Sequence, residues 1–233
     1  MTPARSSSAA GECGLGSDII RNLRKDFRIE FRSRFALNIA VSFAAIVTIA
    51  MSLTAGGVPF PAAVQAILLW TVIFFSAMNG LSHIFVREED QSTALFLRVS
   101  VTTDSIFISK SIFNQVFMMI LLTVITPLFV FFLQVDVIHV AYFILSVAAG
   151  GIAIAAATTI LAAMVAKAGG KGSLFTIISF PVLLPILWVS INSTTGALGQ
   201  AAPSYDNPVF LLAFSGFISV ISFLLFRSVW LED

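Results

Sequence analysis

Charge is scarce in this sequence. Only 11% of its 233 residues are charged and 58% are hydrophobic, whereas about a quarter of the residues in a soluble domain carry a charge. The composition therefore predicts a membrane protein. The net charge of +1 gives no bulk attraction to polyanions, so nucleic acid is not an expected partner.

Cysteine is nearly absent as well. Cys13 is the only one in the chain, so it has no partner for an internal disulfide and cannot supply a cysteine-based metal cluster. Cysteine usage therefore says little about the compartment in which the protein works.

Ionisable residues are missing from the centres of the long apolar segments. Charged groups at membrane depth are costly and usually mark function. The two histidines, His83 and His139, lie near segment ends, and no HExxH motif is present. We therefore expect no catalytic residue, no metal site and no buried carboxylate relay, and the chain is not expected to be an enzyme.

A nucleotide-binding motif is also lacking. The loop AKAGGKGS, residues 166–173, resembles a phosphate-binding loop. The motif requires Gly where Val165 stands and Ser or Thr where Gly172 stands. We interpret the loop as a tight turn carrying Lys167 and Lys171, and any ATP must be bound by another chain.

Six apolar runs are present, each near the roughly 20 residues that an α-helix needs to cross a membrane. None alternates with a period of two, which argues against a transmembrane β-barrel. The predicted fold is all-α, a polytopic membrane protein with six transmembrane helices. The runs are Phe35–Leu53, Val64–Val86, Phe113–Leu133, Ile138–Val165, Leu174–Ile191 and Val209–Phe226.

The basic residues indicate an orientation, because Lys and Arg gather on the cytoplasmic side of membrane proteins. The connections between spans one and two, three and four, and five and six contain none. All 13 fall in the other segments: Arg5, Arg21, Arg24, Lys25, Arg28, Arg32, Arg34, Arg87, Arg98, Lys110, Lys167, Lys171 and Arg227. Both termini are therefore expected in the cytoplasm.

The segment before the first span predicts an amphipathic helix over residues 17–34, preceded by a disordered tail, residues 1–16. Apolar residues recur every four positions from Ile19 to Phe35, with basic residues on other faces. Such a helix lies in the membrane interface. Its expected interfacial residues are Arg24, Phe27, Arg28 and Phe31. A simple positive topology signal is the alternative.

The cytoplasmic insert between spans two and three, residues 87–110, combines charge of both signs with an apolar centre. A purely lipid-binding patch would be basic, whereas a charged helix with exposed apolar residues suits a groove on a partner protein. A short helix over about 91–98 and another beginning at Thr103 or Asp104 are expected. The alternative is a loop folded against the membrane face. The predicted docking residues are Arg87, Glu88, Glu89, Asp90, Thr93, Leu95, Phe96 and Leu97.

Two spans have distinctive composition. The fourth is rich in Gly and Ala, which predicts close helix packing. The fifth contains FPVLLP, in which Pro181 and Pro185 each lack an N–H, so the helix is expected to kink there. A deformable transport element and a static kink explain the two prolines equally well.

An amphipathic elbow, two spans, a charged insert and four further spans resemble the ABC-2-type permeases. The run Arg87 to Asp90, then Thr93, Leu95, Leu97 and Lys110, fits their pattern, with Ser92 and Ser100 where Gly and Pro are common. Within that group the chain looks most like the CcmB family. That likeness rests on LRKDFRIEFRSR, the Gly169-Gly170 turn and the Pro181–Pro185 spacing, and runs from about Leu23 to Trp230.

The resemblance implies a six-span permease domain over residues 35–230 of a haem-exporting ABC complex in the bacterial inner membrane, serving cytochrome c maturation. It implies a CcmA-like ATPase, a CcmC-like haem-handling membrane protein, a small CcmD-like subunit and a periplasmic haem chaperone as partners. ATP hydrolysis would drive haem transfer or release of the loaded chaperone. Two permease bundles on paired ATPases are the usual arrangement, which allows a homodimer.

Haem would be a transported or transiently bound ligand rather than a covalent cofactor. An imidazole can ligate haem iron, which makes His139 a candidate, although a half-solvated interfacial histidine is the favoured reading. The sequence leaves two other functions open: an ABC-2-type exporter of another apolar or amphipathic compound, and a membrane assembly scaffold that transports nothing.

Overall fold

A computed structural model describes residues 7–81, 103–167 and 172–231. Every regular element in this part of the chain is an α-helix, which confirms the all-α prediction. The helices are α1 (Ser7–Ser33), α2 (Phe35–Ala55), α3 (Ala62–Leu81), α6 (Thr103–Phe132), α7 (Val140–Lys167), α8 (Gly172–Ala197) and α9 (Asp206–Leu231). All but α1 are long and apolar enough to cross a membrane, which confirms the six predicted spans.

The first residues of α6 and α1 can be compared with the helix starts predicted from the sequence. Helix α6 begins at Thr103, as predicted for the helix that leads into the third span. Helix α1 begins at Ser7, whereas the sequence predicted a helix only from residue 17. The reason is local: Ala9, Ala10, Glu12 and Leu15 favour helix, and Gly16 inside the helix only weakens it.

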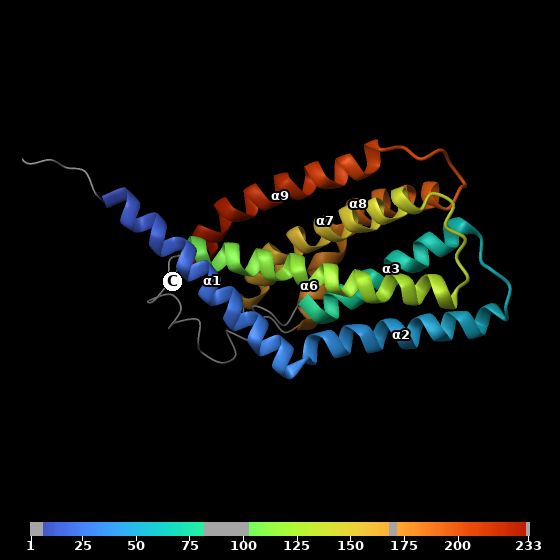
Figure 1. Cartoon of the computed structure of the whole chain (residues 1–233), viewed down its shortest axis with the longest axis horizontal. Helices are drawn as coiled ribbons and strands as arrows, with labels where there is room; N and C mark the ends of the chain where they lie inside the picture. Colours follow the sequence, from blue (N-terminus) through green and yellow to red (C-terminus); the bar gives the residue numbers. More distant parts are fainter. Residues whose placement is uncertain (1–6, 82–102, 168–171, 232–233) are drawn as a thin grey trace, which may run out of the picture.

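The helices form a bundle around α7, with α1 projecting obliquely at one end (Figure 1). Within its membrane-length window α7 is 67% buried, whereas α2 and α9 are each 22% buried. The three connections without Lys or Arg gather at the end opposite α1, and α9 ends near α1 (Figure 1). The end that carries α1 is called the α1 end below. The bundle thus separates the basic segments from the connections that lack them.

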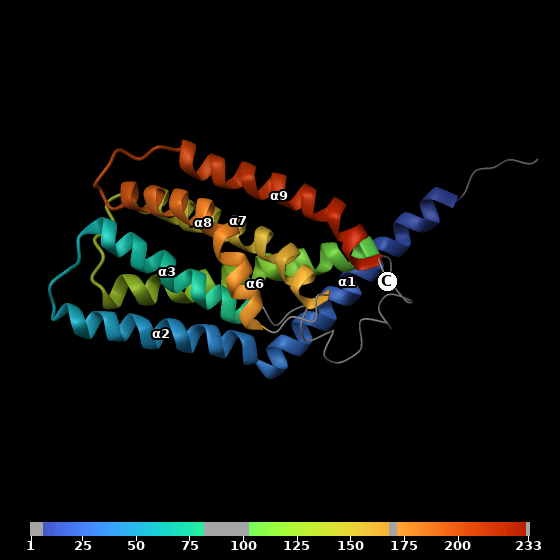
Figure 2. The same cartoon turned by 180° about the vertical axis from the view of Figure 1, so that it is seen from behind.

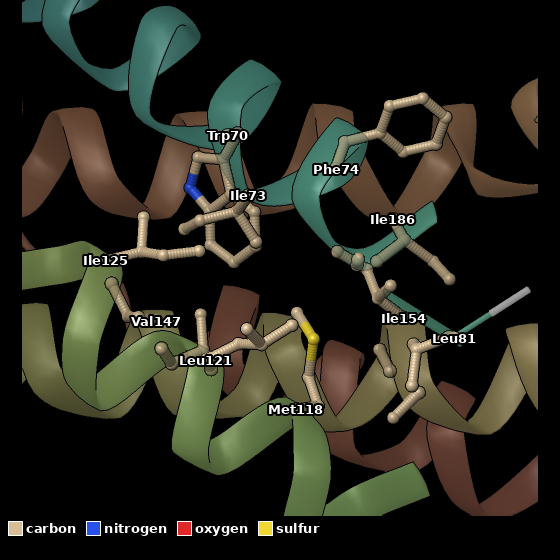
Figure 3. Packing of buried hydrophobic residues seen from close by; sticks show 14 of the residues in the cluster. Trp70, Ile73, Phe74, Leu81, Met118, Leu121, Ile125, Val147, Ile154 and Ile186 are labelled. Carbon is tan, nitrogen blue, oxygen red and sulfur yellow. The ribbon is translucent and has the colours of Figure 1, made fainter. Parts of the chain in front are cut away.

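Small residues on α7 let the neighbouring helices approach closely. A Cβ on Gly150 would lie 2.2 Å from Cη2 of Trp70 on α3, and one on Gly151 would lie 2.3 Å from Cδ1 of Leu122 on α6. Figure 3 shows Trp70, Ile73, Met118 and Leu121 packed together in this region. The predicted packing surface of the fourth span is confirmed, and it serves contacts within the chain.

Candidate functional site

The predicted docking residues, Arg87 to Leu97, lie outside the described residues, as does His83. The structure does describe the end of α3 before the insert and the last residues of the insert, 103–110, which form the first turns of α6. Leu81 at the end of α3 is fully buried, and α6 starts at Thr103. The candidate site is therefore built from the first turns of α6 and the helix packed against them.

That helix is α1, which crosses the first half of α6 (Figure 1). The ring of Phe27 on α1 lies 5.0 Å from the ring of Phe113 on α6, at 56°. Leu23 and Phe27 pack partly buried against the core. The elbow helix therefore has a protein-facing side as well as the membrane-facing side that its sequence predicts.

A buried ion pair joins the two helices. Nζ of Lys110 on α6 lies 3.0 Å from Oδ2 of Asp26 on α1, and the exposed fractions of the two side chains are 4% and 8%. The contact is close enough for an ion pair, although its angles are not those of a hydrogen bond. Lys25 lies farther from Asp26, at 3.6 Å, and is more exposed. Lys110 is thus the main counter-charge of the Asp26 carboxylate.

Other polar side chains line the same interface and the turn of α6 above it. Asn22, one helical turn before Asp26, is buried, and its Nδ2 has no hydrogen-bond partner among the described residues. Ser109 is buried and donates to the carbonyl of Ile106. One turn farther, Nδ2 of Asn114 donates to Oγ1 of Thr159 on α7 at 2.8 Å. Buried polar side chains are therefore present both where α1 packs on α6 and where α6 packs on α7.

The predicted interfacial residues divide between two environments. Arg24, Arg28 and Phe31 are exposed, whereas Phe27 is half-buried against α6. Arg24 and Arg28 line an open basic groove on α1 together with Arg21 and Lys25. The exposed set suits contact with lipid headgroups, which stays a prediction.

Pro181 and Pro185 both lie inside α8, with exposed rings. Figure 2 shows α8 changing direction along its course. Next to the first proline, Phe180 packs edge-on against Phe74 of α3, with ring centroids 5.8 Å apart. A bend that moves during function and a static bend both remain predictions.

His139 lies at the end opposite α1, just before α7, and is exposed. Its backbone N–H donates to the carbonyl of Ala197 at 3.0 Å, which ties two connections together. Within the described ranges no group of three or more His, Cys, Asp or Glu side chains could hold a metal ion. A haem-ligand role for His139 remains a prediction.

Hydroxyl groups connect the helices on the side away from α1. Trp70 Nε1 donates to Oγ1 of Thr194 at 2.9 Å, which fastens α3 to α8. Ser193 on α8 lies 2.7 Å from Oγ of Ser146 and 3.0 Å from the hydroxyl of Tyr142, both on α7. These contacts fasten α8 to both α3 and α7.

Sequence reasoning missed the Asp26–Lys110 pair. From the sequence, Lys110 was identified as a cytoplasmic basic residue at the end of the insert and as part of the ABC-2-type pattern, but not as a partner of Asp26. The available signal was the spacing of Asn22, Asp26 and Glu30, which puts three polar residues on one helical face beside the apolar stripe. A carboxylate on such a face needs a partner wherever the face is covered.

Comparison with protein-family models matches residues 18–227 to the family described as CcmB protein. No curated protein matches the chain.

Proposed function

The chain belongs to the CcmB family, and on that premise we propose that it is the permease subunit of a haem-exporting ABC complex that serves cytochrome c maturation. The family match carries this proposal, because it covers nearly the whole chain and agrees with six membrane-length helices. The protein is a multi-pass membrane protein. Its proposed location is the bacterial inner membrane, with the α1 end and both termini in the cytoplasm.

In this proposal a CcmA-like ATPase docks on the insert that precedes α6. The acidic residues Glu88 and Glu89 meet basic groups of the ATPase, and Leu95 to Leu97 fill an apolar groove. The partners on the other side are a CcmC-like and a CcmD-like subunit and a periplasmic haem chaperone. ATP hydrolysis then drives haem transfer or release of the loaded chaperone.

The contacts at the α1 end support a route by which a conformational change of the ATPase could reach the permease helices. The insert continues directly into α6, whose first turns hold α1 through Lys110 and Asp26 and through Phe113 and Phe27. A buried ion pair fixes the relative position of its helices, because separating it would leave charges in a poorly solvated place. A displacement of the insert would therefore move α6 and α1 together.

Charge reversal in the insert tests the docking surface. We expect the double variant Glu88→Lys and Glu89→Lys to lose most of the co-purifying ATPase subunit and its stimulated hydrolysis. Asp136→Lys is the matched control, because Asp136 is exposed at the end opposite α1 and should leave both measurements unchanged. Unchanged co-purification and stimulation in the insert variant would refute the docking surface.

The cargo needs a separate measurement. The absorption spectrum of the purified complex, with and without His139→Ala, reports whether haem is bound and whether this imidazole ligates it. A haem spectrum in the purified wild-type complex supports the haem assignment. A complex that binds the ATPase but never haem, and that transports another apolar compound, would favour the ABC-2-type exporter instead.

A further inference from the structure

A small cavity of about 230 Å³ lies where α1 ends, α2 begins and α6 passes beside them. Neither Asp26 nor Lys110 lines it. Its walls come from all three helices. The lining residues are Phe27, Glu30, Phe31, Arg34, Leu37, Asn38, Phe113, Phe117 and Ile120. We refer to it as the elbow pocket.

Four phenyl rings line the elbow pocket. Phe27 stacks on Phe31 at 5.9 Å, and Phe113 stacks on Phe117 at 6.1 Å. The two stacks meet through Phe27 and Phe113, 5.0 Å apart. Phe113 and Phe117 are buried and therefore held in place by the bundle. The pocket thus offers ring faces and edges to an apolar, chain-like group.

Arg34 supplies a positive charge among the lining residues. It stands between α1 and α2 with φ 49°, a left-handed conformation that is uncommon for a side chain of this size. Its Nε donates to the carbonyl of Phe31 at 3.4 Å, a weak contact, and no described residue binds its terminal nitrogens. Arg34 is exposed. Two parallel N–H groups are therefore available for a phosphate.

The nearby carboxylate of Glu30 is already engaged. Its Oε1 accepts a hydrogen bond from the backbone N–H of Leu37 at 3.2 Å, in the first turn of α2. The helix N-terminus favours a negative charge at this place. Glu30 therefore serves to cap α2, while Arg34 remains available to an incoming anion.

We infer that the elbow pocket binds an anionic phospholipid, with one acyl chain among the phenyl rings and the phosphate on Arg34. The cavity volume favours a narrow chain over haem, because pockets for drug-sized ligands measure roughly 300–1,000 Å³ and this one about 230 Å³. The inference does not depend on the cargo. It requires only that α1 lies at a membrane surface. The bound lipid would contact α1, α2 and α6 and stabilise their packing.

The test measures lipid retention by the full-length chain in mild detergent, using native mass spectrometry with phosphatidylglycerol and phosphatidylcholine. The wild type should prefer phosphatidylglycerol. Arg34→Asn removes the charge with a residue that tolerates the left-handed conformation, and should weaken phosphatidylglycerol binding about tenfold, as expected for one lost charge-assisted contact. Arg34→Lys should recover part of the preference.

Arg32→Asn is the matched control, because Arg32 is exposed in the last turn of α1, two residues before Arg34, and does not line the elbow pocket. An equal loss in both Asn variants would show general attraction to a basic helix and overturn the site. No loss in either would also overturn it. Inorganic phosphate at millimolar concentration is added as a competitor of bound phosphatidylglycerol. If it displaces the lipid as effectively as added phosphatidylglycerol does, the site binds only an anion, and the acyl-chain part of the proposal is contradicted.

A second variant tests the pocket without touching the charge. Asn38 is exposed on α2 and lines the elbow pocket, so Asn38→Trp should fill it and reduce retention of phosphatidylglycerol. Ser42→Trp, one turn farther along α2 and outside the lining set, is its control. Full retention in Asn38→Trp would contradict the proposal, as would displacement of the lipid by added haem at equal concentration.

Discussion

Lys110 and Asp26 form an ion pair across two helices, with Nζ and Oδ2 3.0 Å apart and both side chains buried. The lysine stands at the start of a membrane-length helix and the aspartate on the elbow helix beside it. The pair therefore joins the last residue of the insert to the helix that the sequence predicts at the membrane interface.

Removing the lysine should be costly. Lys110→Met leaves the Asp26 carboxylate buried, with the longer contact to the partly exposed Lys25 still in place, and breaking a buried pair by deleting one partner costs about 3–5 kcal/mol. We expect a clearly lower midpoint in thermal unfolding of the detergent-solubilised protein. The double variant Asp26→Leu with Lys110→Met should recover much of that loss, because no charge is then stranded.

Lys25→Met is the control for this pair. Its contact with Asp26 is longer, at 3.6 Å, and solvent screens it, so its loss should change the free energy of unfolding by less than about 1 kcal/mol. A Lys110→Met variant as stable as Lys25→Met would show that the pair does not hold the elbow.

Gly150→Ala should destabilise the bundle. The added Cβ would lie 2.2 Å from Trp70 Cη2 and 2.6 Å from Ser190 Oγ, both in packed surroundings, and overpacking of this kind costs about 1–3 kcal/mol. Gly216→Ala on α9 is the matched change, since nothing lies within 4 Å of its added Cβ. There the lower helix propensity of glycine should make the alanine variant more stable by up to about 1 kcal/mol. Thermal unfolding of both variants measures the contrast.

Thr194→Val tests the fastening of α3 to α8. The change keeps the side-chain shape but leaves Trp70 Nε1 without its acceptor at 2.9 Å, and an unsatisfied buried donor costs about 1–3 kcal/mol. Thr195→Val removes a hydroxyl that bonds only the carbonyl of Ile191 in its own helix. We expect a lower unfolding midpoint for Thr194→Val alone. Equal midpoints would show that the indole N–H finds another partner.

The spans were predictable because each is a local property of the sequence. A run of apolar residues long enough to cross the hydrocarbon core, without the period-two alternation of a barrel strand, forms a helix, since a helix satisfies its backbone within the segment. The division of Lys and Arg between alternate connections likewise predicted that the three connections without basic residues lie at one end of the bundle. The bundle brings these three connections together at the end opposite α1 (Figure 1). The early start of α1 was missed because its first residues lack the apolar period used to detect helices.

The candidate site was harder to predict because its contacts join distant segments. Asp26 sits among six basic neighbours between Arg21 and Arg34, any of which could have been its partner by sequence. Only the packing of α1 on α6 selects Lys110. The elbow pocket depends in the same way on Arg34, whose left-handed conformation turns the chain from α1 into α2, and nothing in the residue type indicates that turn.

The prolines of α8 connect the bundle's shape with the proposed coupling. Pro181→Ala restores an N–H that can donate to the carbonyl of Ile177, so α8 should become straighter and more stable, because proline inside a helix costs about 3 kcal/mol. If the bend transmits the stroke, this variant should unfold at a higher temperature yet give weaker stimulation of the partner ATPase. Full stimulation in Pro181→Ala would identify the bend as a fixed packing feature, because a straightened helix would then still carry the stroke.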